Sequence, residues 1–227
     1  MHIYELDGGK YPSVTTILKL LSMDDRLLKW ANFMGFKHKD ITKIQEESAE
    51  FGTLLHSQLR SIVDPKIECP DIIKDPRIEY DCNIIKKRFN EYFKDIKYRT
   101  IDTEMTLISK NLGYAGTLDW LTQISTQEGD KLTLLDFKTS KKVIPTMYLQ
   151  LGGYYNLLKD ININVDCAGI VIANTNECSL NPISKDLLEK YATTFLVLVD
   201  LYKKWNLIST VDVDIQLLKV LRKQEIK

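Results

Sequence analysis

The stretch Leu132–Ser140, LTLLDFKTS, decides which fold this sequence predicts. It is mostly apolar, and Asp136 and Lys138 come near its end. Side chains alternate between the two faces of a β-strand, so these two charged groups project from the same face. A buried charge is costly unless it is paired, hydrogen-bonded or bound to a metal. The pattern therefore indicates either a structural ion pair at a strand end or part of a functional site.

A second strand is expected upstream, where GYAGTLDWL (residues 113–121) carries Asp119 after a glycine-marked turn. Asp119 precedes Asp136 by 17 residues. This spacing suits two antiparallel strands joined by the polar turn Ser125–Asp130. The pairing would bring two carboxylates and a lysine to one end of a small sheet.

The rest of the chain alternates helical and strand patterns, without an internal repeat or a low-complexity segment. Apolar spacing predicts helices at residues 12–21, 24–43, 46–63, 77–93, 146–159 and 184–205, with a short helix at the C-terminal end. Strands are expected at residues 2–6, 98–109 and 165–173, besides the two described above. This order predicts an α/β protein with a central mixed sheet flanked by helices and an N-terminal helical layer.

We expect one domain over residues 1–227, with an N-terminal helical part (1–97), a sheet core that carries the aspartates (98–175) and C-terminal helices (176–227). Lysine plus arginine and aspartate plus glutamate both number 31. This balance excludes a strong global field, so any basic surface for nucleic acid must be local. Without an apolar signal core or a run of about 18 apolar residues, we expect a soluble, intracellular (cytoplasmic) protein with no membrane partner.

Two residues in the helix expected at 46–63 are unusual. Gly52 lies within the helical pattern, where glycine costs about 1 kcal/mol relative to alanine, so we expect another backbone to approach it closely. His56 lies beside the apolar stripe of the same helix. It is either a hydrogen-bonded core residue or, if it meets the aspartates in space, part of a site.

Together, Asp119, Asp136 and Lys138, with His56 and Glu104 as additions, would form an oxygen-rich site with one nitrogen ligand. Such donors favour Mg²⁺ or Mn²⁺, and an imidazole favours Mn²⁺ slightly; zinc fits less well without a cysteine ligand. A divalent ion beside an ammonium suits phosphodiester hydrolysis, because the ion polarises the phosphoryl oxygen and lowers the pKa of bound water. Lys138 would position the attacking water or offset charge in the transition state.

Asp119 followed by Asp-Phe-Lys at 136–138 resembles the signature of the PD-(D/E)xK nucleases, with Leu118 in place of the proline. Leu118 in place of the proline, and aspartate (Asp136) as the acidic residue of the second motif, are both similar to variants of the RecB-type and phage exonuclease branches. Three further stretches are similar to motifs of these branches and of the mitochondrial genome-maintenance exonucleases. These are YPSVTTIL (11–18), GTLLH (52–56) and QLGGY (150–154). The five matches follow the family's order over residues 11–155.

The resemblance implies a restriction-endonuclease-like core and a DNA exonuclease that uses Mg²⁺ or Mn²⁺. Its substrate would be single-stranded or resected DNA ends in replication, recombination or repair, with proteins of those processes as partners, and the motif style is typical of a virus or mobile element. No cysteine follows Cys178, so we expect no iron–sulfur cluster of the kind that one RecB-type sub-branch holds. A structure-specific or sequence-specific endonuclease and a non-catalytic nucleic-acid-binding module stay open as alternatives, as does the oligomeric state.

The resemblance also implies roles for individual residues. The metal ligands would be His56, Asp119, Asp136, the carbonyl of Phe137 and Glu104. The catalytic set would be Asp119, Asp136, Lys138 and Gln150, of which Gln150 orients Lys138 or the scissile phosphate. The DNA contacts would be Ser13, Thr15, Thr16, Thr139, Ser140, Lys141 and Tyr154. Helix capping is an alternative for at least one of the first three, packing is one for Tyr154, and a solvated loop is one for Lys141 and Lys142.

Overall fold

The computed structural model describes residues 2–21, 32–69 and 75–209. The strands are β1 (Ile3–Leu6), β2 (Gly9–Pro12), β3 (Tyr98–Ser109), β4 (Tyr114–Thr126), β5 (Gly129–Lys138), β6 (Cys167–Ala173) and β7 (Cys178–Ser184). The helices are α1 (Val14–Leu18), the 3-10 helix η1 (Lys19–Leu21), α3 (Ile41–Val63), α4 (Pro76–Phe93), α5 (Pro145–Asp160) and α6 (Lys185–Ser209).

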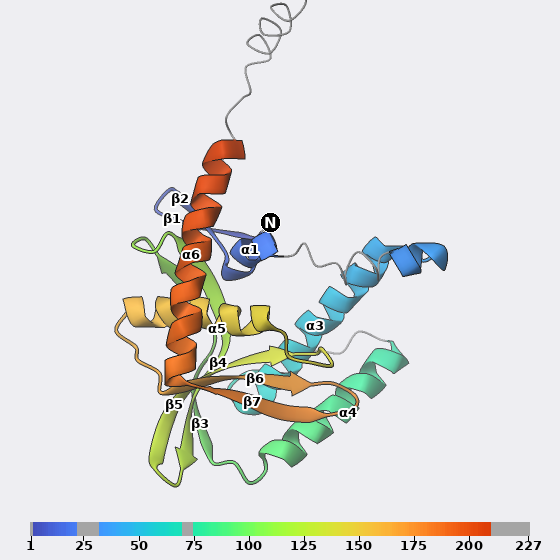
Figure 1. Cartoon of the computed structure of the whole chain (residues 1–227). Coiled ribbons are helices and arrows are strands. Elements are labelled where there is room, and N and C mark those ends of the chain that lie inside the picture. The colour runs from blue at the N-terminus through green and yellow to red at the C-terminus, as the bar shows by residue number, and fades with distance from the viewer. Residues whose placement is uncertain (1, 22–31, 70–74, 210–227) are drawn as a thin grey trace, which may run out of the picture.

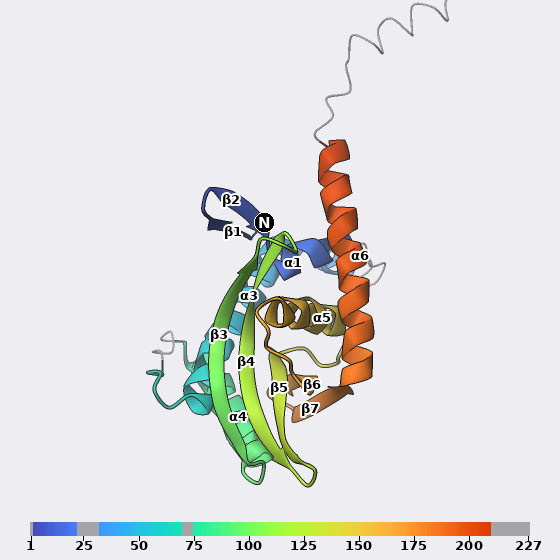
Figure 2. The same ribbon diagram turned by 90° about the vertical axis from the view of Figure 1, so that its left-hand side faces the viewer.

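The centre of the protein is a five-stranded sheet in the order β3-β4-β5-β6-β7. Strands β5 and β6 run parallel, and the other neighbours are antiparallel. Figures 1 and 2 show helices on both faces of this sheet. The predicted mixed α/β class is confirmed, and the arrangement is consistent with a restriction-endonuclease-like core.

The strand predicted at 98–109 and the predicted antiparallel pair that carries the aspartates are also confirmed. Strands β3, β4 and β5 form a meander, and the two aspartates lie at its open end. Strands β4 and β5 pair only as far as Trp120 and Leu135. Strand β5 then continues beside β6 until Lys138. The two antiparallel strands therefore separate where Asp119 and Asp136 lie, which leaves room between them for side chains.

Each face of the sheet has its own hydrophobic core. Helices α1, α5 and α6 pack on one face, and α3 and α4 pack on the other. Along β6, Ile170 and Ile172 enter the first core, whereas Val171 and Ala173 enter the second. This division follows from the side-chain period of two, and it explains why β6 is a continuous apolar run.

Polar caps determine where α3 and α4 begin. Asp40 accepts a hydrogen bond from the backbone N–H of Lys43, at 3.1 Å, and Asp75 accepts one from that of Arg77, at 2.9 Å. Pro76 occupies the first turn of α4, where its missing N–H costs nothing. None of the described helices combines the length and the apolar character that a membrane crossing requires.

The predicted C-terminal helical part is wrong at its start, because residues 178–184 form β7 instead. Its sequence, CSLNPIS, is half polar and contains Pro182, so it carries little strand signal. β7 lies at the edge of the sheet, where a residue without an N–H is tolerated. The helix predicted from Ser184 does begin there, since α6 starts at Lys185. Its predicted successor near the C-terminus lies outside the described residues.

Two N-terminal boundaries also differ from the prediction. Residues 9–12 form β2, which pairs with β1 as a hairpin, so the first helix starts only at Val14. The helix predicted over 24–43 is interrupted at residues 37–40, which are not helical. The chain turns after residue 36, and α3 begins at Ile41 rather than at Glu46. Residues 22–31 of that predicted helix lie outside the described part of the chain.

The expectation of a close backbone at Gly52 is wrong. A Cβ added to Gly52 would meet nothing within 4 Å. The glycine that brings two backbones together is Gly152 in α5, where a Cβ would lie 2.6 Å from backbone atoms of Tyr191 and Ala192 in α6. Helical spacing alone could not distinguish these two glycines, because what each one faces depends on tertiary packing.

Candidate active site

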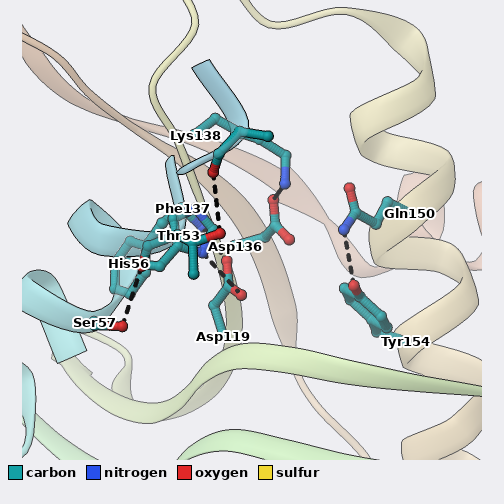
Figure 3. A network of polar contacts seen from close by, with 10 residues as sticks. Thr53, His56, Ser57, Asp119, Asp136, Phe137, Lys138, Gln150 and Tyr154 are labelled. Carbon is teal, nitrogen blue, oxygen red and sulfur yellow. Dashed lines mark hydrogen bonds and ion pairs between the residues drawn. The ribbon is translucent and has the colours of Figure 1, made fainter. Parts of the chain in front are cut away.

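Three ionisable side chains from three different elements meet at the open end of the meander. His56 of α3, Glu104 of β3 and Asp119 of β4 each offer a ligand atom, and these atoms lie within 4.8 Å of one another. We call this set the His–Glu–Asp cluster. His56 Nδ1 lies 3.4 Å from Asp119 Oδ1, and Figure 3 shows the two side chains together. One imidazole and two carboxylates form a donor set that suits Mn²⁺ or Mg²⁺.

A local distortion of β3 allows Glu104 to join this cluster. Thr103 pairs with Trp120, and Met105 pairs with Leu118, so Glu104 lies opposite Asp119 across the two strands. The register shifts by one residue just before this point, and Glu104 has a φ of +53°. A left-handed conformation at a residue other than glycine costs about 1–3 kcal/mol and is typical of functional sites.

The separation of β4 from β5 leaves a backbone donor for Asp119. The N–H of Phe137 donates to Asp119 Oδ2, at 2.7 Å, where a main-chain carbonyl would otherwise accept. Burial acts to raise the pKa of Asp119, but the charge and hydrogen bond of His56, the charge of Lys138 and the Phe137 N–H together outweigh burial and the pKa is lowered. Asp119 is therefore an ionised carboxylate held on both oxygens.

Asp136 and Lys138 form an ion pair on one face of β5, as the strand spacing predicts. Asp136 is only 1% exposed. Apart from the Lys138 ammonium, its oxygens have no hydrogen-bond donor among the described residues. Burial raises the pKa of Asp136 to about 6, more than Lys138 lowers it. For Lys138, burial acts to lower the pKa, but the charges of Asp136 and Asp119 and the hydrogen bond to Asp136 together outweigh burial and the pKa is raised.

The remaining members of the cluster hold protons more firmly than usual. Burial and the neighbouring Asp119 raise the pKa of Glu104. Burial acts to lower the pKa of His56, but the charge and hydrogen bond of Asp119, together with the charge of Asp136, outweigh burial and the pKa is raised. Three carboxylates thus crowd a partly buried space that contains one lysine and one histidine. Asp136 does not belong to the 4.8 Å group, although its charge acts to raise the pKa of His56, and the charge of Asp119 acts to raise the pKa of Asp136.

Gln150 and Tyr154 of α5 form the opposite wall (Figure 3). Gln150 Nε2 donates to Tyr154 Oη, at 2.8 Å. The Tyr154 ring occupies space that exists only because residue 116 is glycine, since a Cβ on Gly116 would lie 2.7 Å from Tyr154 Cε1. Within the described residues, no hydrogen bond joins Gln150 to Lys138. Tyr154 is buried, so its hydroxyl stabilises Gln150 from within the wall.

The N-terminal serine and threonines have mostly structural partners. Ser13 caps α1 and accepts a hydrogen bond from the N–H of Thr16, at 3.0 Å. The Thr16 hydroxyl donates to the carbonyl of His2, at 2.9 Å. Ser13 and Thr16 are buried, whereas Thr15 is exposed. The capping alternative therefore explains Ser13, and Thr15 has the accessible side chain of the three.

The loop after β5 carries the other predicted DNA contacts. Thr139 and Ser140 are half-buried, and Lys141 and Lys142 are exposed. Ser140 Oγ donates to the carbonyl of Lys142, at 3.0 Å, and the Ser140 carbonyl accepts from Asn174 Nδ2, at 3.1 Å. The loop is thus tied to the β6–β7 turn next to the site, with both lysines free to face solvent.

A chain of hydroxyls that the sequence did not predict lies beside the cluster. Tyr4 Oη lies 2.8 Å from Thr117 Oγ1, which lies 2.7 Å from Thr106 Oγ1. Both threonines lie two residues from a cluster member, Glu104 on β3 and Asp119 on β4. The spacing from Asp119 is a sequence signal for Thr117, but the contact with Tyr4 depends on the β1–β2 hairpin folding back onto the sheet.

Arg60, which the sequence did not single out either, lies on α3 four residues after His56. Its Nε donates to Thr103 Oγ1, at 3.0 Å, directly beside the backbone of Glu104. Residues four apart share one face of a helix, so this spacing was the available signal. Without the position of β3, however, nothing distinguished Arg60 from a solvated arginine.

Comparison with known proteins adds little to this geometry. No family model and no curated protein matches the chain. Among solved structures, it is similar to SSO0001, at 16% identity and a TM-score of 0.38, over 87% of this chain and 78% of that one. It is also similar to an alkaline exonuclease (LHK-Exo) from Laribacter hongkongensis, at 9% identity and a TM-score of 0.34, over 70% and 84%. Structural similarity this weak does not indicate what the protein does, so its function is inferred from the residues of the site.

Proposed function

We propose that this protein is a metal-dependent nuclease that hydrolyses phosphodiester bonds of DNA. The observation that carries this proposal is the His–Glu–Asp cluster beside the buried ion pair of Asp136 and Lys138. A structural ion pair would need only those two residues. Gathering three more ionisable groups at the same place costs stability, and such arrangements are typical of active sites.

The residues present fit a divalent cation. His56, Glu104 and Asp119 would hold Mg²⁺ or Mn²⁺, and Asp136 has oxygens with no hydrogen-bond donor other than Lys138 among the described residues. The carbonyl of Phe137 is a further donor, because in an extended strand it faces the same edge as the N–H that binds Asp119. Once bound, such an ion polarises a phosphoryl oxygen and lowers the pKa of bound water.

Lys138 would supply the positive charge that this reaction needs at the phosphoryl group. Its ammonium is held by Asp136, so it requires little reorganisation to donate to a phosphoryl oxygen or to the attacking water. Negative charge grows on the phosphoryl oxygens in the transition state, and a preorganised cation in a partly buried site stabilises it strongly. Gln150, fixed by Tyr154, would orient Lys138 or the scissile phosphate from the opposite wall.

The finer assignment, an exonuclease on single-stranded or resected ends, is supported by the motif resemblance. The same resemblance supports a role in replication, recombination or repair, and a viral origin of the protein. Thr15, Thr106 and Lys141 are exposed and Thr117 is half-buried, and their hydroxyl and ammonium groups would contact the DNA backbone. Neutral or cationic donors of this kind position a strand through its phosphates without reading its sequence.

The test compares linear and circular single-stranded DNA, each labelled and incubated with Mg²⁺, Mn²⁺ or EDTA. We expect the linear strand to be degraded with either metal, the circle to stay intact, and EDTA to stop the reaction. Cleavage of the circle would identify an endonuclease. DNA binding without cleavage under every metal condition would instead identify a non-catalytic binding module. A Lys138→Ala preparation purified in parallel controls for contaminating nucleases.

A further inference from the structure

Arg60 presents a guanidinium group at the edge of the His–Glu–Asp cluster. It lies one helical turn after His56 on α3, about 6 Å further along the helix axis. Its Nε donates to Thr103 Oγ1, at 3.0 Å. Thr103 is only 3% exposed and directly precedes Glu104. A buried hydroxyl thus fixes the direction of the arginine side chain.

The charge of Arg60 is not neutralised by a carboxylate. Across residues 2–21, 32–69 and 75–209, no acidic oxygen lies within 4 Å of its nitrogens, and no hydrogen bond engages its terminal amines. Its field lowers the pKa of Glu104, against the larger effect of burial. A half-buried cation with unused donors, beside the proposed metal site, is suited to bind an anion.

A guanidinium is well suited to a phosphate group. Its N–H donors form a rigid fork that matches two phosphate oxygens, and it stays charged at any working pH. Such charge-assisted bonds are stronger than neutral ones. Because the whole chain has no net charge, a local cation of this kind must supply part of the attraction for a polyanion.

We propose that Arg60 binds the backbone phosphate next to the scissile one in a single-stranded DNA substrate. This inference rests on the proposed nuclease function. The divalent ion that the cluster would hold would attract the scissile phosphate to a place near His56, and Arg60 lies one helical turn away. This step is comparable to the distance between successive phosphates of an extended strand. Arg60 is then a binding residue that sets which bond enters the site, and Thr103 is its positioning residue.

The first measurement is the affinity for a labelled single-stranded oligonucleotide, with Ca²⁺ in place of Mg²⁺. We expect Arg60→Ala to weaken binding about 10- to 100-fold, the scale of a lost charged hydrogen bond. The slope of log affinity against log salt should fall by about 0.7. Arg60→Lys should lose less, and Thr103→Val, which keeps the charge and frees the side chain, should lose a few-fold.

The matched control is Arg99→Ala. Arg99 lies at the start of β3, is exposed, and donates to Gln123 Oε1. Its removal should leave oligonucleotide affinity unchanged. A general loss of positive charge would weaken both arginine variants alike, so the pair separates a specific phosphate contact from a change in net charge. Thermal melting of each variant verifies that it folds, and Arg60→Lys keeps the test readable if Arg60→Ala melts early.

The second measurement locates the contact. Single methylphosphonate linkages, which lack the phosphate charge, are placed at each position relative to the mapped cleavage site. Wild-type protein should bind about tenfold less tightly when the linkage next to the cleaved one is neutral. Arg60→Ala should be insensitive at that linkage while keeping the wild-type response elsewhere, because only that contact has been removed.

Three outcomes overturn the inference. One is wild-type affinity in Arg60→Ala, and another is an unchanged methylphosphonate profile. The third is an Arg60→Ala variant that binds Mn²⁺ more weakly, as measured by calorimetry, but binds DNA with unchanged affinity. That result would mean that Arg60 positions Glu104 for metal binding and does not contact DNA. Failure of the nuclease proposal looks different, because wild-type protein would then cleave no DNA with any metal. Cleavage by wild type and Arg60→Ala with equal KM would reject only the role of Arg60.

Discussion

Helices α5 and α3 cover opposite faces of the same sheet, but their surroundings differ. Helix α5 is buried along most of its length, and at Gly152 it touches the backbone of α6. The buried residues of α3 lie only in its second half, between Leu55 and Val63, and Gly52 faces open space. His56 lies at this boundary. The candidate site therefore lies where the buried part of α3 begins, because a side chain there is held by the core on one side and is accessible to a substrate on the other.

The largest effect should come from the site. Lys138→Ala should fold and lose DNA cleavage by about 10²-fold or more, the scale of removing one group that stabilises the transition state. Asp119→Asn should do the same. Lys131→Ala, at the opposite end of β5 and paired with Glu128, is the control and should keep full activity. Metal-dependent cleavage at wild-type rates by both site variants would show that the site lies elsewhere.

The two helical glycines test the comparison directly. Gly152→Ala should destabilise the protein by about 3 kcal/mol or more, because its Cβ would meet backbone atoms that cannot rotate away. Gly52→Ala should stabilise it by up to about 1 kcal/mol, since alanine favours the helix and nothing blocks the methyl group. Urea unfolding of both variants measures the difference. Equal free energies of unfolding would mean that α3 and α5 are packed alike.

A divalent ion should stabilise the α3 side of the protein. At a Mn²⁺ concentration about 100 times its Kd, mass action adds about 2.7 kcal/mol to the folded state. For a chain of this length, that raises Tm by roughly 5–10 °C. Scanning calorimetry with Mn²⁺ and with EDTA measures the shift. It should disappear in Asp119→Asn and persist in Gly52→Ala, and an equal shift in Asp119→Asn would exclude the His–Glu–Asp cluster as the ion site.

The smallest effect is a pH dependence of the ion-free protein. The pKa of Asp136 is raised to about 6, and those of Glu104 and His56 are also raised. These groups bind protons more tightly folded than unfolded, so their contribution to stability is lost as pH rises from about 4 through 7. Asp119, with its lowered pKa, acts in the opposite direction only below about pH 4.

In EDTA, the free energy of unfolding should therefore be about 1 kcal/mol higher at pH 5.5 than at pH 8, because Asp136, with a pKa of about 6, is mostly protonated at the lower pH and ionised at the higher one. Urea titrations at the two pH values measure it. Asp136→Asn removes the main titrating group and should flatten the dependence. Stability that increases from pH 5.5 to pH 8 in EDTA would contradict the crowding of carboxylates at this site.

Local patterns in the sequence were enough to predict much of the scaffold. The apolar alternation of Leu132–Ser140 places Asp136 and Lys138 on one strand face, and the spacing to Asp119 predicts the antiparallel pair. These predictions depend only on the period of a strand and on short turns, which neighbouring residues determine. The edge strand β7 was missed because its side chains have no clear alternation and only its neighbour β6 provides hydrogen bonds.

By itself, then, the amino-acid sequence determined the strand faces, the meander and the residue types available for chemistry. Tertiary structure alone decided that His56, Glu104 and Asp119 meet, and that Arg60 stands beside them. These contacts require the register shift in β3, the separation of β4 from β5 and the docking of α3. Each of those depends on residues far apart in the chain, which no local period encodes.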